Sequence, residues 1–230
     1  MKTIGLIGGM SWESTQTYYQ LINQMVRERL GGLHSAKLVL YSVDFAEIEA
    51  LQHRGDWDAT ARILGQAATS LQAAGADFLV LCTNTMHKVA EQIERAAGVP
   101  LLHIADATAQ ALKNDGVSQV GLLGTRFTME QAFYRERLEL QGLEVLVPDE
   151  AERETVHSII YQELCQGIID AGSKAAYLDV VSSLSARGAQ AVILGCTEIG
   201  LLIGDEDTTV KLYDTTAIHA RRAVELALGR

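Results

Sequence analysis

The chain contains one short segment twice, and this repeat constrains the fold more than any other feature. Residues 74–85 read Ala-Gly-Ala-Asp-Phe-Leu-Val-Leu-Cys-Thr-Asn-Thr, and residues 187–198 read Arg-Gly-Ala-Gln-Ala-Val-Ile-Leu-Gly-Cys-Thr-Glu. Superposing them places Thr83 on Cys196. Each copy is a continuous apolar run, typical of a buried strand, followed by small polar residues. The pattern predicts two equivalent strands, and an internal two-fold axis would aim Thr83 and Cys196 at each other across a cleft.

Two further blocks recur in the same order along the chain. Residues 4–8 match residues 120–124, and residues 104–109 resemble residues 212–217. An alternative explanation is that all α/β units look alike, because each combines an apolar run, a glycine and a helix. The aligned Gly-Ala pairs and the shared order of three blocks favour a true repeat, which predicts two similar halves.

Apolar runs alternate along the chain with longer helical segments. Such alternation predicts parallel sheets flanked by helices and joined by right-handed crossovers. The turn-rich stretch at residues 113–118 is the expected join between the halves. The expected strands are residues 4–7, 38–43, 78–81, 101–104, 120–123, 191–194 and 211–213, and the expected helices are residues 14–29, 56–74, 85–97, 128–141, 151–171 and 218–228. The predicted fold class is therefore α/β with two pseudo-symmetric domains.

Composition and charge narrow the class of protein. Of the 230 residues, 48% are hydrophobic and 21% are charged, which is typical of a globular core rather than a disordered chain. A net charge of -10 argues against nucleic acid as a partner. The three widely spaced cysteines do not predict a disulfide framework, no apolar run is long enough to span a membrane, and the N-terminus lacks a signal-peptide pattern. We therefore expect a cytoplasmic protein.

The ends of the predicted strands gather the polar residues. Ligands of parallel α/β sheets bind beyond the carboxyl ends of the strands, where residues 8–11, 82–85, 124–128 and 195–198 all lie. The Gly-Gly-Met-Ser turn at residues 8–11 offers backbone N–H groups to an anion. It lacks the glycine spacing of a dinucleotide-binding loop. The expected ligand is therefore a small molecule with a carboxylate.

Cys196 and Thr83 are the candidate proton-transfer residues. A thiol near backbone N–H groups has a pKa lowered from about 8.5 toward neutrality, so Cys196 is expected to act as a base, unless it is simply a small core residue. Thr83 is a much weaker base and needs activation, and it also fits an ordinary polar strand end. Cys82 lies one position earlier than Thr83, so its side chain should point the opposite way, into the core.

Several other residues are candidates for binding or support, and some of them have two interpretations. Asn84, Thr85 and Thr197 carry amide and hydroxyl groups suited to a carboxylate, and Glu198 is placed to orient a neighbour or to titrate. His87 either pairs with a thiol or caps and packs. The six histidines show no metal-ligand spacing, so no metal site is expected. Gln52 either reaches the cleft or is solvated, and Met10 is either a lid or part of the core.

Five motifs together resemble one known family. They are Gly-Gly-Met-Ser-Trp-Glu-Ser-Thr (8–15), Val-Asp-Phe (43–45), Thr-Asn-Thr-Met-His (83–87), Leu-Leu-Gly-Thr (122–125) and Gly-Cys-Thr-Glu-Ile (195–199). The chain resembles the aspartate/glutamate racemase family over nearly its whole length, most closely the enterobacterial amino-acid racemase branch. The resemblance implies two flavodoxin-like domains, a site in the cleft between them, no cofactor and a homodimer. It implies domains at residues 1–100, joined by a returning helix at 214–230, and at residues 101–213.

The resemblance also implies the reaction. Two thiols in this family act as acid and base on opposite faces of the α-carbon, and here Cys196 keeps the second thiol while Thr83 replaces the first. The implied substrate-binding residues are Met10, Gln52, Asn84, Thr85, Thr125 and Thr197, with Glu198 and His87 in support. The lysine with which many aspartate-specific members bind the distal carboxylate is missing from residues 163–167. We therefore expect an amino-acid racemase for aspartate, glutamate or a broader set.

Two other functions fit the same features. A decarboxylase or isomerase with one thiol needs only Cys196 to protonate a carbanion, and no opposing base. A two-lobed amino-acid-binding module needs no thiol at all. Exchange of the substrate's α-proton with solvent distinguishes a racemase from both.

Overall fold

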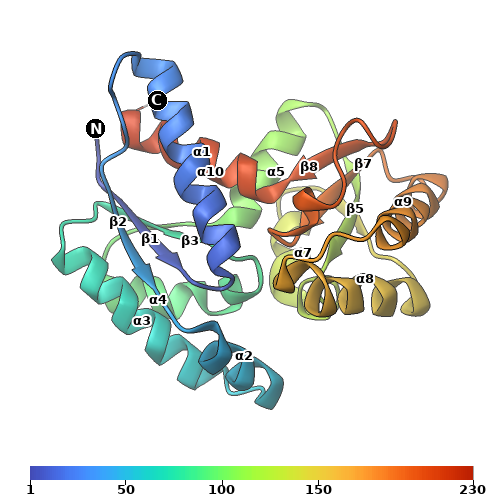
Figure 1. The fold of residues 1–230 in the computed structure, drawn as a ribbon, viewed down its shortest axis with the longest axis horizontal. Helices are drawn as coiled ribbons and strands as arrows, with labels where there is room; N and C mark the ends of the chain where they lie inside the picture. The colour runs from blue at the N-terminus through green and yellow to red at the C-terminus, as the bar shows by residue number, and fades with distance from the viewer. Residues whose placement is uncertain (230) are drawn as a thin grey trace. The chain divides into compact units, whose positions relative to one another are not determined.

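The computed structural model describes residues 1–229 and contains two compact units. Unit 1 comprises residues 1–104 together with the segment from His219 onward, and unit 2 comprises residues 105–218. Both ends of the chain therefore belong to unit 1, as the labelled termini in Figure 1 show. None of the helices described in residues 1–229 is long and apolar enough to cross a membrane.

Unit 1 is built on a parallel four-stranded sheet. Its strands lie in the order β2-β1-β3-β4. The strands are β1 (Ile4–Gly8), β2 (Leu38–Ser42), β3 (Phe78–Leu81) and β4 (Leu101–Leu102), and the helices are α1 (Trp12–Leu30), α2 (Phe45–Arg54), α3 (Trp57–Ala73), the 3-10 helix η1 (Thr85–Val89), α4 (Ala90–Ala97) and α10 (Thr215–Leu228), whose first turn belongs to unit 2.

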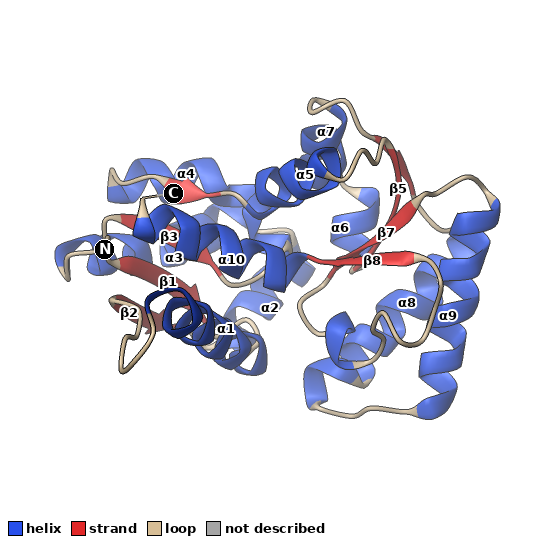
Figure 2. Cartoon of the chain, turned by 90° about the horizontal axis from the view of Figure 1, so that it is seen from above, coloured by secondary structure: helices blue, strands red, loops and turns tan. Residues whose placement is uncertain are grey.

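Helices cover both faces of this sheet (Figure 2). Alternate strand residues such as Leu79 and Leu81 pack in one apolar cluster with residues of α3 and α4. Phe78 and Val80, which point the other way, pack with α1 and α10. Because both faces are buried, every residue of β3 is apolar, as the continuous run in the sequence predicts. The last helix of the chain thus supplies part of one covering layer.

Unit 2 repeats this plan with the strand order β6-β5-β7-β8, again all parallel. The strands are β5 (Gln119–Gly124), β6 (Glu144–Leu146), β7 (Ala191–Gly195) and β8 (Lys211–Asp214), and the helices are α5 (Ile104–Asn114), α6 (Arg126–Glu130), α7 (Ala132–Glu139), α8 (Glu150–Gln162), η2 (Leu164–Gln166), α9 (Ala171–Ala186) and η3 (Ile199–Leu201). The predicted fold class, two similar α/β domains with parallel sheets, is confirmed.

The repeat extends to the pairing register and the turns. Ile7 pairs with Leu81 in unit 1, and Leu123 pairs with Leu194 in unit 2. The turn before each strand contains a glycine with positive φ, 94° at Gly75 and 108° at Gly188. The residue after each glycine donates its N–H to a carbonyl of the preceding helix, at 3.0 Å and 3.1 Å. The short repeated segment is therefore one structural unit used twice.

The structure corrects several expected boundaries. The stretch at residues 113–118 joins α5 to β5 inside unit 2, so it is not the join between the halves. The third repeat block is displaced, because Leu101 occupies the position in β4 that Leu212 occupies in β8. The reason is that β4 has only two paired residues before its helix begins at Ile104, whereas β8 has four.

Expected helices also differ from the observed ones. Residues 128–141 form two short helices, α6 and α7, interrupted at Gln131, which has an extended conformation. Residues 85–97 begin as the 3-10 helix η1 before α4. The first helix begins at Trp12 rather than at residue 14, and it is capped by Ser11, whose side chain accepts a hydrogen bond from the Ser14 N–H.

Candidate functional site

The predicted site residues cluster at the carboxyl ends of the strands within each unit. In unit 1, Met10 follows β1, and the Thr83–Thr85 segment follows the adjacent strand β3. In unit 2, Thr125 follows β5, and the Cys196–Glu198 segment follows the adjacent strand β7. Each unit therefore presents two neighbouring loops, and these loops follow corresponding strands of the repeat.

Thr83 is buried and held by its backbone. The residue is only 8% exposed. Its N–H donates to the Leu81 carbonyl at 2.9 Å, and its own carbonyl lies 2.8 Å from His87 Nδ1. Cys82, one residue earlier, packs with Phe78 and the other residues facing α1 and α10. Complete burial raises the pKa of the Cys82 thiol far above its usual value. Cys82 is a core residue, as predicted from strand alternation.

His87 uses both ring nitrogens to hold the backbone. Its Nε2 accepts a hydrogen bond from the Ile104 N–H at 3.2 Å, so the proton lies on Nδ1, which donates to the Thr83 carbonyl. Burial, followed by the charges of His103 and His219, lowers the pKa of His87 well below its ordinary value. His87 is therefore a neutral residue that positions Thr83, and of the two interpretations made from the sequence the structure supports capping and packing over a Cys–His pair.

Two further histidines complete a buried aromatic cluster that the sequence did not reveal. The ring of His87 lies 4.5 Å from that of His103 and 5.7 Å from that of His219. His219 donates from Nε2 to the Leu102 carbonyl at 2.8 Å and accepts from the Tyr18 hydroxyl at Nδ1, also at 2.8 Å. Burial lowers the pKa of His219 to about 4. The position of His219 on the apolar side of the last helix was the one signal for this cluster.

One backbone N–H of the glycine turn after β1 is used within the protein. The Gly9 N–H donates to the Thr15 hydroxyl at 2.8 Å, so it is not aimed at an anion as the sequence suggested. Met10 packs in the apolar cluster beneath α2 and α3. Gln52 is only 4% exposed and donates from Nε2 to the Met86 sulfur at 3.7 Å. The structure therefore places Met10 in the core, and Gln52 in a buried position beside it.

Three of the remaining candidate binding residues lie at the N-termini of short helices. Asn84 and Thr85 are both buried at the start of η1, where Asn84 occupies the cap position without a side-chain cap bond. Thr125 caps α6, and its hydroxyl oxygen accepts a hydrogen bond from the Thr128 N–H at 3.4 Å. These positions place amide and hydroxyl groups at helix N-termini, where carboxylates are favourably bound.

Cys196 and Glu198 form the central polar contact of unit 2. The Cys196 thiol donates to Glu198 Oε2 at 3.0 Å, and the Thr197 hydroxyl donates to the same oxygen at 2.7 Å. Burial, and then the negative charge of Glu198, raise the pKa of Cys196 well above its ordinary value. The expectation of a lowered pKa was wrong, because burial and the Glu198 carboxylate outweigh the backbone hydrogen bond from Glu198, which acts in the lowering direction. Cys196 rests as a thiol with a proton acceptor beside it.

Three residues around Cys196 escaped the sequence analysis. Tyr177 packs in the same apolar cluster, and Cys165 packs against it. Burial raises the pKa of Tyr177 well above its usual value, and negative charge on Cys196, Cys165, Glu163 and Glu198 acts in the same direction. The Tyr177 hydroxyl donates to the Val156 carbonyl at 3.0 Å. No motif in the sequence connects Tyr177 with Cys165, because Tyr177 lies in α9 and Cys165 lies in η2.

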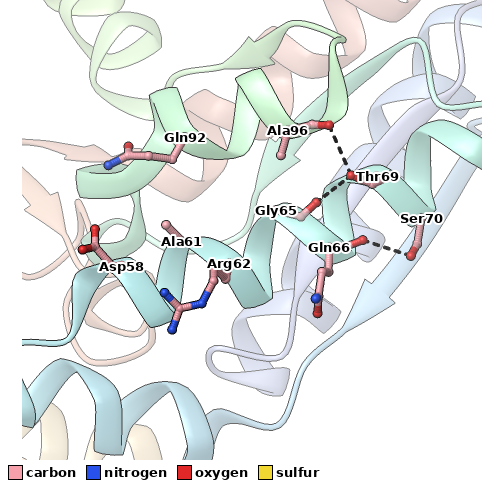
Figure 3. Close-up of a pocket in the computed structure, with 9 residues that line it drawn as sticks. All are labelled: Asp58, Ala61, Arg62, Gly65, Gln66, Thr69, Ser70, Gln92 and Ala96. Carbon is pink, nitrogen blue, oxygen red and sulfur yellow. Dashed lines mark hydrogen bonds between the residues drawn. The ribbon is translucent and has the colours of Figure 1, made fainter.

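A groove also runs along the outside of α3 and α4 in unit 1 (Figure 3). It has a volume of about 780 Å³, and its walls approach closely, since the Thr69 hydroxyl is 3.3 Å from the Ala96 carbonyl. Its lining contains none of the residues predicted for the site. Its lining residues are Asp58, Ala61, Arg62, Gly65, Gln66, Thr69, Ser70, Gln92 and Ala96.

Most of the chain matches one known protein family. Residues 7–223 match the model of a family described as Asp/Glu/hydantoin racemase. The chain belongs to the Asp/Glu/hydantoin racemase family. The match spans both units and includes every candidate site residue from Met10 to Glu198.

Individual relatives of this racemase family are similar over their full length. A candidate Asp/Glu racemase from Yersinia pestis, known as a crystal structure, is 60% identical, with a TM-score of 0.93 over 99% of this chain and 100% of that one. An aspartate racemase homologue from Pyrococcus horikoshii is 38% identical, with a TM-score of 0.87 over the same shares. The broad-specificity amino-acid racemase RacX from Bacillus subtilis is 24% identical over 98% of each chain.

Proposed function

We propose that this protein is an amino-acid racemase that works without a cofactor. In this proposal it inverts aspartate, glutamate or a broader set of amino acids by removing the α-proton from one face and returning a proton to the other. Family membership and the names of the relatives support the reaction class. The hydrogen bond from the Cys196 thiol to Glu198 is the observation that carries the proposal, because it pairs a proton-transfer group with an acceptor at the predicted strand end.

Cys196 and Glu198 together transfer the proton on one face of the substrate. Glu198 takes the thiol proton, and the resulting thiolate removes the α-proton and becomes a thiol again. In the reverse direction, the protonated thiol delivers its proton to the carbanion. In this direction Thr83 starts without its proton and removes the α-proton, and protonated Glu198 then returns a proton to the thiolate, so Glu198 takes part in both directions. The raised pKa of Cys196 favours the thiol in the resting protein.

Thr83 acts on the other face, directly or through a water that it holds. A hydroxyl donates a proton to a carbanion but removes one poorly, so the two directions are chemically unequal. His87 supports this role by fixing the Thr83 backbone through its carbonyl. The proton missing from Thr83 and the extra proton on Glu198 exchange with water after the product leaves. This scheme requires Thr83 and Cys196 to act on opposite faces of the substrate's α-carbon.

The proposed substrate contacts use the polar strand ends. Asn84, Thr85 and Thr197 bind the α-carboxylate and the amine, and Thr125 contributes from the helix that it caps. Gln52 and Met10 complete the site from unit 1 by shaping it. Preorganised donors around the carboxylate stabilise the carbanion, which is otherwise very unfavourable.

Incubating each enantiomer in deuterium oxide tests the proposal. We expect the α-hydrogen to exchange and the centre to invert, followed by mass spectrometry and chiral chromatography. The Cys196→Ser variant should lose both, and Thr83→Cys should raise the rate. Exchange that survives Cys196→Ser unchanged would remove Cys196 from the mechanism. Carbon dioxide release from a malonate without amino-acid exchange would indicate a one-thiol decarboxylase instead, and binding without exchange would indicate a binding module.

We also propose that the enzyme is a cytoplasmic homodimer. The family resemblance supports the dimer, and the three free cysteines suit a reducing compartment. Light scattering coupled to size exclusion tests the dimer: a 25.0 kDa mass in solution would identify a monomer.

A further inference from the structure

The carbonyl of Thr83 is held by a side chain where an α-helix would use a backbone N–H. In an α-helix this carbonyl would accept from the N–H of His87, four residues later. That N–H instead donates to the Asn84 carbonyl at 3.1 Å, because the 3-10 helix η1 begins here. The ring Nδ1 of His87 takes its place and donates to the Thr83 carbonyl at 2.8 Å. The orientation of Thr83 therefore depends on the orientation of one histidine ring.

Thr83 also lies outside the regular elements on either side of it. The strand β3 ends at Leu81, and η1 begins at Thr85. The Thr83 N–H donates to the carbonyl of Leu81, only two residues earlier, at 2.9 Å, and this hydrogen bond closes a γ-turn. Neither a sheet ladder nor a helix fixes the position of Thr83, so the two hydrogen bonds of its own backbone do.

The His87 ring is held in turn by the segment that follows β4. Its Nε2 accepts from the Ile104 N–H at 3.2 Å, and the ring of His103 packs against it with 4.5 Å between the ring centres. A shift of residues 103–104 would therefore move the His87 ring and, with it, the Thr83 carbonyl.

His219 and Tyr18 fix that same segment. His219 donates from Nε2 to the Leu102 carbonyl, and the Tyr18 hydroxyl donates to Nδ1 of His219, both at 2.8 Å. Both side chains are fully buried, so bulk water does not compete for these hydrogen bonds. A neutral imidazole carries one proton, and a donor at Nδ1 keeps that proton on Nε2, where it reaches Leu102. The phenol of Tyr18 thus selects the form of His219 that holds the segment.

Four hydrogen bonds therefore connect α1 and α10 with Thr83. They join Tyr18 to His219, His219 to the Leu102 carbonyl, the Ile104 N–H to His87, and His87 to the Thr83 carbonyl. All six residues belong to unit 1. Cys196 and Glu198 belong to unit 2, and none of these four hydrogen bonds involves them.

We propose that Tyr18 and His219 are positioning residues for Thr83, and that they control proton transfer on the Thr83 face of the substrate but not on the Cys196 face. This inference rests on the proposed racemase function and extends it to α1 and α10. Both residues act through the Thr83 backbone rather than on the substrate. The effect is strong because a small displacement of a catalytic group lowers the rate steeply.

Replacing Tyr18 with phenylalanine gives the sharpest test, because it removes one oxygen atom and keeps the ring. In Tyr18→Phe the Nδ1 of His219 loses its donor, so His219 can take the other tautomer and release Leu102. We expect inversion in deuterium oxide to fall about tenfold, while deuterium uptake with retained configuration through Cys196 stays within about twofold. A general loss of folded protein would instead lower both rates equally.

Two control variants lie on the same helix. Tyr19→Phe removes the hydroxyl of a tyrosine that is 53% exposed, and it should change neither rate. Ile22→Val opens a small cavity one turn from Tyr18 in the same apolar cluster, so it should lower stability and leave the ratio of inversion to exchange unchanged. Equal losses of inversion and exchange in Tyr18→Phe, or the same change of ratio in Ile22→Val, would overturn the proposal.

NMR spectroscopy tests the network separately from the reaction. In the wild-type protein the ring nitrogen shifts should place the proton on Nε2 of His219 and on Nδ1 of His87. Tyr18→Phe should also shift the resonance of the Thr83 carbonyl carbon, which reports its hydrogen bond, and Tyr19→Phe should not. The opposite tautomer in either ring, or an unshifted Thr83 carbonyl, would overturn the positioning role and retain the racemase. The expected shifts without any α-hydrogen exchange in the wild-type protein would overturn the racemase and retain the positioning of Thr83.

Discussion

The Cys196 thiol donates a hydrogen bond to the Glu198 carboxylate, with 3.0 Å between Sγ and Oε2. Both residues are buried, and Thr197 donates to the same oxygen. The sulfur therefore has a built-in acceptor for its proton, and the carboxylate is held toward it by a second donor.

Replacing Glu198 with glutamine should lower the pKa of the Cys196 thiol and at the same time slow catalysis. The negative charge of Glu198 raises the pKa of Cys196, so Glu198→Gln should shift the pH dependence of Cys196 alkylation to lower pH. The same variant should lower α-proton exchange about 100-fold, because the acceptor for the thiol proton is gone. Mass spectrometry of the alkylated peptide measures the first effect. Glu206→Gln, an exposed change in the same unit, is the control, and an unshifted alkylation profile in Glu198→Gln would contradict the pairing.

Removing the Thr83 hydroxyl should uncouple exchange from inversion. Thr83→Val keeps the shape of the side chain but offers no proton, so Cys196 should still remove and return hydrogen on its own face. One enantiomer should then incorporate deuterium while keeping its configuration, and racemisation should fall by about 100-fold or more. Chiral chromatography with mass detection reads both quantities at once. If inversion continued at the wild-type rate, Thr83 would have no part in proton delivery.

Acid should destabilise the protein through the buried histidines. Because the pKa of His219 is about 4 in the folded protein and about 6.5 in an unfolded chain, the unfolded state binds the proton first as pH falls. The free energy of unfolding should be fully present above pH 6.5 and should fall by about 3 kcal/mol for His219 between pH 6.5 and 4. His87 acts in the same direction.

Urea titrations across this pH range measure the effect. His219→Gln should flatten the dependence on pH, although it also removes two hydrogen bonds and lowers stability overall. His34 is exposed, so His34→Gln should keep the wild-type slope. Equal slopes in all three proteins would mean that His219 does not control the response to acid.

Any side chain at Gly9, in the turn after β1, should lower the stability of the protein. The φ of Gly9 is 94°, and an added Cβ would clash with the Val43 carbonyl oxygen. Gly31 also has a positive φ, 76°, but an added Cβ there meets nothing within 4 Å. Gly31→Ala should cost about 1 kcal/mol from backbone strain, and Gly9→Ala should cost at least about 2 kcal/mol more. Thermal unfolding of the two variants gives the comparison, and equal losses would show that the turn can relax.

The repeat made the fold predictable from the sequence. The segment ending at Thr85 and the segment ending at Glu198 have the same strand, the same preceding glycine turn and the same register. Periodicity failed where elements are short: β4 has two paired residues, and the break at Gln131 lies within a stretch that has no glycine or proline to mark it.

The chemistry of the site was less predictable than its location. Cys196 and Glu198 are two positions apart in the sequence, but only the folded structure shows that the carboxylate faces the thiol and raises its pKa. The contact between His87 and His219 joins residues more than a hundred positions apart, and single-sequence patterns do not contain such pairings.

The place of α10 in the first unit bears on how the protein is made. Ala220, Ala223 and Val224 fill the apolar layer over Leu6 and Val80, but the ribosome adds them after every residue of unit 2. Unit 2 is one continuous stretch, so it can fold during synthesis while the opening hundred residues still lack their final covering helix. The half of the molecule that is translated first is therefore the half that matures last.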